Sequence, residues 1–163
     1  MAESTVRHRS VLWAVLVGGS IAGTLDILFA ISFAGYNGVP PADLLQTVAS
    51  GLRGNAAFSG GIPTAALGLV LHFGMSYLWA GIFVVAARRL PRLVRQPMLS
   101  GVFFGVAVFL TMRLVVLPLS AFPYPVTFKP LSTILDLLSH TFLFGVPIAL
   151  AARRAYPGTA PQA

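Results

Sequence analysis

The stretch of sequence that decides the fold is MLSGVFFGVAVFLTMRLVVL, which runs from Met98 to Leu117 and contains one charged residue, Arg113. An α-helix needs about 20 predominantly apolar residues to cross the hydrocarbon core of a bilayer. The sequence therefore predicts an all-α membrane protein, a four-helix bundle whose helices contact the lipid bilayer. Besides residues 98–117, the predicted transmembrane helices are residues 11–33, 62–87 and 131–152.

The composition of the chain agrees with a membrane protein. Of its 163 residues, 56% are hydrophobic and only 9% are charged, whereas a soluble domain carries about 25% charged residues. We therefore expect residues 1–163 to form a single integral membrane domain. The formal charge of +7 comes from short clusters between apolar runs rather than from a basic face, so we expect no nucleic-acid partner. The absence of cysteine excludes disulfides and thiolate metal ligands.

The distribution of Lys and Arg predicts an orientation. Eight of these cations flank one set of helix ends, whereas the connections at the other set contain only Arg53 and Lys129. The positive-inside rule places the eight cations in the cytoplasm, so we expect both termini to be cytoplasmic. The eight cations are Arg7, Arg9, Arg88, Arg89, Arg92, Arg95, Arg153 and Arg154.

The connection between the first two spans is predicted to contain a short outer interfacial helix. Pro41 and Asp43 suit its first turn, Ser50 is its expected last residue, and Gly51 suits its C-terminal cap. The glycine-rich residues 51–61 are predicted to form a plain loop, and a segment that dips back between the helices is the alternative.

Prolines mark the third and fourth spans. Pro118 is expected to end the third span, because it cannot continue the helical hydrogen bonding. The following connection, residues 118–130, carries four prolines and is predicted to be stiff and extended. Pro147 lies within the fourth span, where it is expected to kink the helix.

Small residues and a weak repeat bear on how the spans pack. Glycine or alanine recurs at a spacing of four in the pairs Gly19 and Gly23, Gly101 and Gly105, and Gly145 and Ala149, which lets helix backbones approach in lipid. The second and fourth runs also share the pattern L-x-L-x-x-H followed by A-A-R-R. The two patterns allow a duplicated helical hairpin, and chance similarity of apolar helices is the alternative.

Five polar residues within the spans are the candidate functional residues. Four of them lie 16 residues from the cytoplasmic edge of their helices, at a depth of about 24 Å, and the fifth lies one turn closer to the cytoplasm. Because an unpaired charge in the hydrocarbon core is unfavourable, we expect these side chains to face one another and Arg113 to pair with one of the aspartates. The five residues are Asp26, His72, Arg113, Asp136 and His140.

Several functions remain open for this polar layer. One interpretation is structural glue, and another is a site that binds or passes a proton, a cation or a small solute. A haem or metal site through paired His72 and His140 is another alternative. A fourth alternative is a non-catalytic accessory or assembly subunit of a larger membrane complex or homo-oligomer. No nucleophile constellation is present, which favours a protein without enzymatic activity, and an enzyme acting on lipid has no motif to support it.

Two stretches resemble a known group of proteins. One is Arg113-Leu-Val-Val-Leu-Pro-Leu-Ser with Phe122-Pro, then His140 before Arg153-Arg154, and the other is the loop from Ala49-Ser50-Gly51 to Gly60-Gly61 before Leu71-His72-Phe73. Together they resemble the YagU-like bacterial inner-membrane proteins. The resemblance implies a bacterial inner-membrane location and a multi-helix fold. It supplies no activity, cofactor or functional residue.

The predicted topology can be tested with reporter fusions. Fusions after Pro91 and at the C-terminus are expected to report the cytoplasm, and a fusion at Tyr124 is expected to report the outside, because of the eight-to-two asymmetry of Lys and Arg. The measurement is the activity of paired reporters that work only on one side of the membrane. An outside signal for the connection of residues 88–95 would contradict the prediction.

Overall fold

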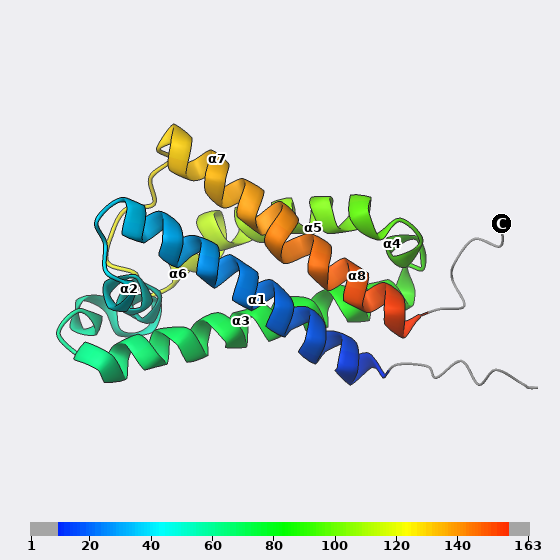
Figure 1. Cartoon of the computed structure of the whole chain (residues 1–163), viewed down its shortest axis with the longest axis horizontal. Helices are drawn as coiled ribbons and strands as arrows, with labels where there is room; N and C mark the ends of the chain where they lie inside the picture. Colours follow the sequence, from blue (N-terminus) through cyan, green and yellow to red (C-terminus); the bar gives the residue numbers. More distant parts are fainter. Residues whose placement is uncertain (1–9, 157–163) are drawn as a thin grey trace, which may run out of the picture.

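The computed structural model describes residues 10–156, all of whose regular structure is helical (Figure 1). Four helices are long and apolar enough to cross a membrane, and they confirm the predicted all-α fold with four spans. Each begins within one residue of its predicted start and extends two or three residues beyond its predicted end. Arg7, His8 and Arg9 lie outside the described residues. The four spans are Val11–Tyr36, Gly61–Arg89, Pro97–Leu119 and Pro130–Ala155.

Two of the spans are single helices and two are composite. The first span is α1 (Val11–Tyr36) and the second is α3 (Gly61–Arg89). The third consists of α5 (Pro97–Thr111), η2 (Met112–Val116) and α6 (Leu117–Leu119). The fourth consists of α7 (Pro130–Leu138), η3 (Ser139–Gly145) and α8 (Val146–Ala155). The short connecting helices are α2 (Pro41–Arg53), η1 (Gly54–Ala57) and α4 (Arg92–Arg95).

The bundle has two distinct ends. One end, here called the basic end, carries the start of α1, the turn of α4 and the end of α8, and the other end carries α2 and the connection of residues 120–129 (Figure 1). The hydrophobic core lies mainly in the half next to the basic end, where small side chains such as Ala14, Ala80 and Ala152 are fully buried against Val84 and Ile148. The helices therefore pack most closely on the basic side.

The third span does not end at Pro118, because a π-helical turn accommodates the proline. Proline has no N–H to donate, so the carbonyl of Leu114 loses its usual partner. Within η2 the N–H of Leu117 instead donates to the oxygen of Met112, five residues earlier, and the helix continues to Leu119. Such π-helical turns are known where a helix absorbs an irregularity, and they are frequent at functional sites.

The fourth span uses the same device before Pro147. The N–H of Val146 donates to the oxygen of Thr141, and η3 is π-helical from Ser139 to Gly145. The irregularity predicted at Pro147 therefore lies mainly on its N-terminal side, spread over seven residues.

The connection after α1 differs from the predicted plain loop. The helix α2 continues past Gly51 to Arg53, and Gly54, with a φ of 57°, occupies the capping position predicted for Gly51. A 3₁₀ helix, η1, then fills part of the expected loop. The extension follows from packing, since α2 lies against α3 with the backbone of Leu45 over Gly68, and the N–H of Ala121 donates to the oxygen of Gly51 at 2.9 Å.

The glycine pairs mark close helix contacts, as predicted. An added Cβ on Gly101 would lie 2.6 Å from the Cα of Val146, and one on Gly105 would overlap the carbonyl of His140. The hairpin of spans one and two packs like the hairpin of spans three and four. In each hairpin, the second glycine of the pair contacts the residue that follows the histidine of the other span. The first glycine contacts the fifth residue after that histidine. This likeness agrees with a duplicated hairpin. The contacts are Gly23 with Phe73, Gly105 with Thr141, Gly19 with Tyr77, and Gly101 with Gly145.

Substitution of one glycine tests this packing. Gly105→Ala is expected to destabilise the protein by about 1–3 kcal/mol, because overpacking forces the backbone of the fourth span to move. Gly81→Ala is the matched control, since an added Cβ there meets nothing within 4 Å. The measurement is the thermal unfolding midpoint in detergent. Equal midpoints for the two variants would show that the third and fourth spans are not in tight contact at Gly105.

Candidate functional site

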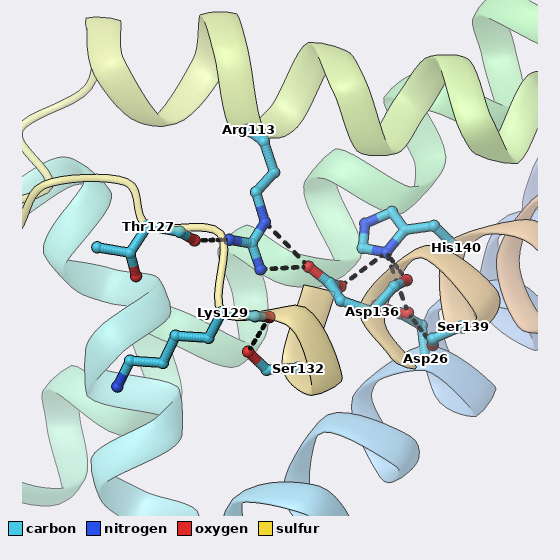
Figure 2. A network of polar contacts seen from close by, with 8 residues as sticks. All are labelled: Asp26, Arg113, Thr127, Lys129, Ser132, Asp136, Ser139 and His140. Atoms are coloured by element: carbon cyan, nitrogen blue, oxygen red, sulfur yellow. Dashed lines mark hydrogen bonds and ion pairs between the residues drawn. The ribbon is translucent and has the colours of Figure 1, made fainter. Parts of the chain in front are cut away.

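The centre of the candidate site is an ion pair between the third and fourth spans. The Nη2 and Nε atoms of Arg113 donate to Oδ2 of Asp136 at 2.8 and 3.1 Å. The side chains are only 19% and 32% exposed. Nη1 of Arg113 also donates to the carbonyl oxygen of Thr127 at 2.8 Å, which ties the connection of residues 120–129 to the pair (Figure 2). Of the two predicted partners, Arg113 therefore pairs with Asp136.

The other aspartate, Asp26 of α1, contacts the fourth span one turn further along. It accepts a hydrogen bond of 2.6 Å from the hydroxyl of Ser139, and Nδ1 of His140 lies 3.9 Å from the same carboxylate oxygen. Its side chain is 14% exposed. Three spans thus contribute to one network, here called the polar cluster. Its members are Asp26, Arg113, Asp136, Ser139 and His140 (Figure 2).

His140 links the two carboxylates. Its Nδ1 atom lies 3.0 Å from Oδ1 of Asp136 and 3.0 Å from the carbonyl oxygen of the same residue. Because all of these neighbours are acceptors, Nδ1 carries a hydrogen and donates it. The contact confirms the predicted shared face of Asp136 and His140. The rings of Phe109 and Phe144 lie against the imidazole, with centroid distances of 5.9 and 6.0 Å.

The second nitrogen of His140, Nε2, is the free position of the cluster. No hydrogen-bond partner is present for it within residues 10–156, and Figure 2 shows it directed away from the carboxylates. The His140 side chain also lines two cavities. A water molecule or a small polar solute in either cavity would therefore lie beside the His140 side chain.

The larger cavity has a volume of about 300 Å³ and lies at the end of the bundle opposite the basic end. Arg113, Asp136 and His140 form its polar wall. Its apolar wall includes Phe109, Met112 and Leu117 of the third span. The connection covers one side of it with Phe122, Pro125, Val126 and Thr127. This volume is at the lower end of the roughly 300–1,000 Å³ found for small-molecule sites.

The smaller cavity lies deeper and brings His72 to the site. Its volume is about 50 Å³, and Asp26, His72, Trp79 and His140 line it. Nε2 of His72 forms a hydrogen bond of 2.9 Å with the carbonyl oxygen of Gly23. The indole N–H of Trp79 has no hydrogen-bond partner within the described residues. The space is large enough and polar enough to hold ordered water.

The charges of the cluster do not balance when both histidines are neutral. Two carboxylates face one guanidinium, which leaves one negative charge among these side chains. Protonation of Nε2 on His140 would neutralise it, as would a bound cation. Among residues 10–156 no three His, Asp or Glu side chains are arranged to hold a metal ion. The fold therefore adds no further metal ligands to the candidates His72 and His140.

The structure brings all five predicted residues to the lining of two adjoining cavities. Sequence reasoning did not include Ser139 and Thr127. Ser139 directly precedes His140, and its hydroxyl reaches Asp26 from the first residue of the π-helical segment η3. Thr127 contributes a backbone carbonyl, which residue type does not reveal.

The fold and the site together define a class of protein: a small membrane protein with four spans and a buried polar cluster beneath a covered cavity. Comparison with protein-family models, with curated proteins and with solved structures found no match to this chain. The polar cluster therefore carries the evidence for function.

Removal of Arg113 tests whether the ion pair holds the cluster together. Arg113→Leu is expected to destabilise the protein strongly, because loss of one partner of a buried pair costs roughly 3–5 kcal/mol in soluble proteins. Adding Asp136→Asn should recover part of the loss, since no unpaired carboxylate then remains. The measurement is thermal unfolding in detergent. Arg53→Leu is the control, because Arg53 is exposed at the end of α2, and equal effects of Arg113→Leu and Arg53→Leu would contradict the prediction.

Proposed function

We propose that this chain is a bacterial inner-membrane protein with cytoplasmic termini, and that its polar cluster binds a proton at His140. The single observation that carries the proposal is the position of His140, with Nδ1 bound to a carboxylate, Nε2 directed away from the carboxylates and the side chain lining both cavities. The location and orientation rest on the resemblance to the YagU-like proteins and on the asymmetry of Lys and Arg.

The chemistry of histidine supports a proton rather than another ligand. Imidazole is the side chain whose unperturbed titration falls between about pH 5 and 8. Two carboxylates lie within 4 Å of Nδ1, so a positive charge on the ring would lie beside negative charges. A cation or small solute bound in the larger cavity would contact the guanidinium of Arg113, which forms part of the cavity wall. Repulsion between the like charges disfavours the binding of a cation unless a proton leaves the cluster.

The two cavities provide the steps of a proton path. His140 and Met112 line both of them, so the imidazole lies between the covered cavity and the deeper one. A proton taken up at Nε2 is matched by one released from Nδ1 toward Asp136 or Asp26. Toward the basic end the buried core is apolar, with Val84, Ile148 and Ala152 buried. Passage to the basic end therefore needs a second conformation or a second copy of the chain.

Proton uptake can be measured in reconstituted liposomes that contain a pH-sensitive dye. Under an imposed membrane potential the wild type is expected to carry protons, and His140→Gln is expected to abolish this flux, because an amide keeps hydrogen bonding but cannot change charge near neutral pH. His8→Gln is the matched control, the same substitution at a histidine that precedes the first span in sequence. Thermal unfolding is recorded in parallel.

The outcomes separate the alternatives. Equal flux in wild type and His140→Gln contradicts the proposal. A wild type without flux or proton uptake, together with variants of unchanged stability, favours an accessory subunit. A Soret band or bound metal in the purified protein, lost in His72→Gln and His140→Gln, favours the haem- or metal-binding alternative.

A further inference from the structure

The turn between the second and third spans carries a concentration of unneutralised positive charge. Arg88 and Arg89 end α3, and Arg92 and Arg95 form the ends of α4. All four side chains are exposed, and none forms an ion pair within residues 10–156. The described carboxylates lie elsewhere: Asp26 and Asp136 belong to the polar cluster, and Asp43 is in α2 at the opposite end.

An apolar groove begins directly at this turn. It lies between α3 and α5, has a volume of about 380 Å³ and is lined by Ile82, Phe83, Ala86, Leu93, Leu99 and Phe103, together with Ser100 and Phe104. The rings of Phe83 and Phe104 pack edge to face at 4.9 Å and join the two helices. Phe103 is 67% exposed and Leu99 is 52% exposed. The groove thus presents apolar side chains that no part of the described chain covers.

The packing of the third span explains why the groove is open. Gly101 and Gly105 turn one face of α5 against the fourth span. Phe103 lies between them in sequence, and the helical rotation of 100° per residue directs it to the other side. The close contacts of α5 are therefore made with η3 and α8. On the side that faces α3, α5 presents the rings of Phe103 and Phe104, and the groove lies between the two helices.

The geometry points to an anionic phospholipid as the occupant, with an acyl chain in the groove and its phosphate on the arginines. Leu93 lines the groove, and the helix α4 that contains it also carries Arg92 and Arg95, which places the charges at the groove's rim. Arginine binds phosphate oxygens through paired N–H donors. Basic pockets between membrane helices at the cytoplasmic surface bind acidic headgroups, and anionic lipids are concentrated there.

Charge rather than apolar area selects this occupant. Within a bilayer an acyl chain gains little by moving from lipid to a leucine-lined groove, because both surroundings are equally apolar. The groove therefore supplies shape, and the arginines supply the preference for an anionic headgroup. A second protein copy would need carboxylates to complement the turn, and this chain presents none at its basic end within the described residues.

The test compares phosphatidylglycerol with phosphatidylcholine of the same acyl chains, added to the purified full chain in detergent. Bound lipid is counted by native mass spectrometry, and thermal stabilisation is recorded in parallel. The wild type is expected to prefer phosphatidylglycerol at least about tenfold. Arg92→Gln with Arg95→Gln should weaken phosphatidylglycerol binding roughly thirtyfold, since each arginine near an anionic surface contributes about fivefold.

Two matched variants make the result decisive. Arg153→Gln with Arg154→Gln removes the same charge from the end of α8 and should retain the preference. Ala86→Phe fills the groove and should lower binding with the arginines intact. Equal binding of the two lipids, or equal losses in both arginine pairs, would overturn the proposal. A stable dimer in detergent that Phe103→Ala dissociates would also overturn it, since a second copy would then occupy the groove.

Discussion

The ion pair between Arg113 and Asp136 is the interaction on which the polar half of the molecule depends. A charge within the hydrocarbon core must find its partner inside the protein, and this pair satisfies Arg113, the cation that lies within a described span rather than in its last turn. Because the guanidinium also binds the carbonyl of Thr127, the same pair fixes the connection that covers the larger cavity. Asp26 then contacts Ser139 and His140 instead of a guanidinium, so the unbalanced negative charge lies beside the imidazole.

The prolines shape the site as well as the helices. Pro118 and Pro147 each remove a backbone donor, and each is preceded by a π-helical segment that absorbs the loss. These two segments carry Arg113, Ser139 and His140, so the irregular backbone and the polar side chains occupy the same level. A π-helical turn rotates the residues that follow it relative to an α-helix. The relative positions of the side chains in the polar cluster therefore depend on prolines several residues away in the sequence.

The sequence was sufficient for the spans and for most of the site, and it failed where backbone geometry decides. The runs of apolar residues predicted the four helices because lipid permits few alternatives. The depth of Asp26, Arg113 and Asp136 predicted that they meet, because isolated charges are unfavourable there. The helical continuation through Pro118 was not predictable from the proline alone, since its effect depends on whether a π-helical turn can form. The extension of α2 to Arg53 depends on its contact with α3, which involves residues distant in sequence.

The two halves of the bundle are built on different principles, and this difference bears on any movement through it. Near the basic end, alanines and glycines bring the backbones together around a mainly apolar core. Near the other end, the polar cluster and the two cavities lie between the spans. His140 is thus connected to one end of the bundle by polar groups and separated from the basic end by packed core. Close packing resists gradual deformation, so access from the basic end requires the spans to shift as units. The π-helical segments, which lie where the two halves meet, are the places at which such a shift would least disturb the helices.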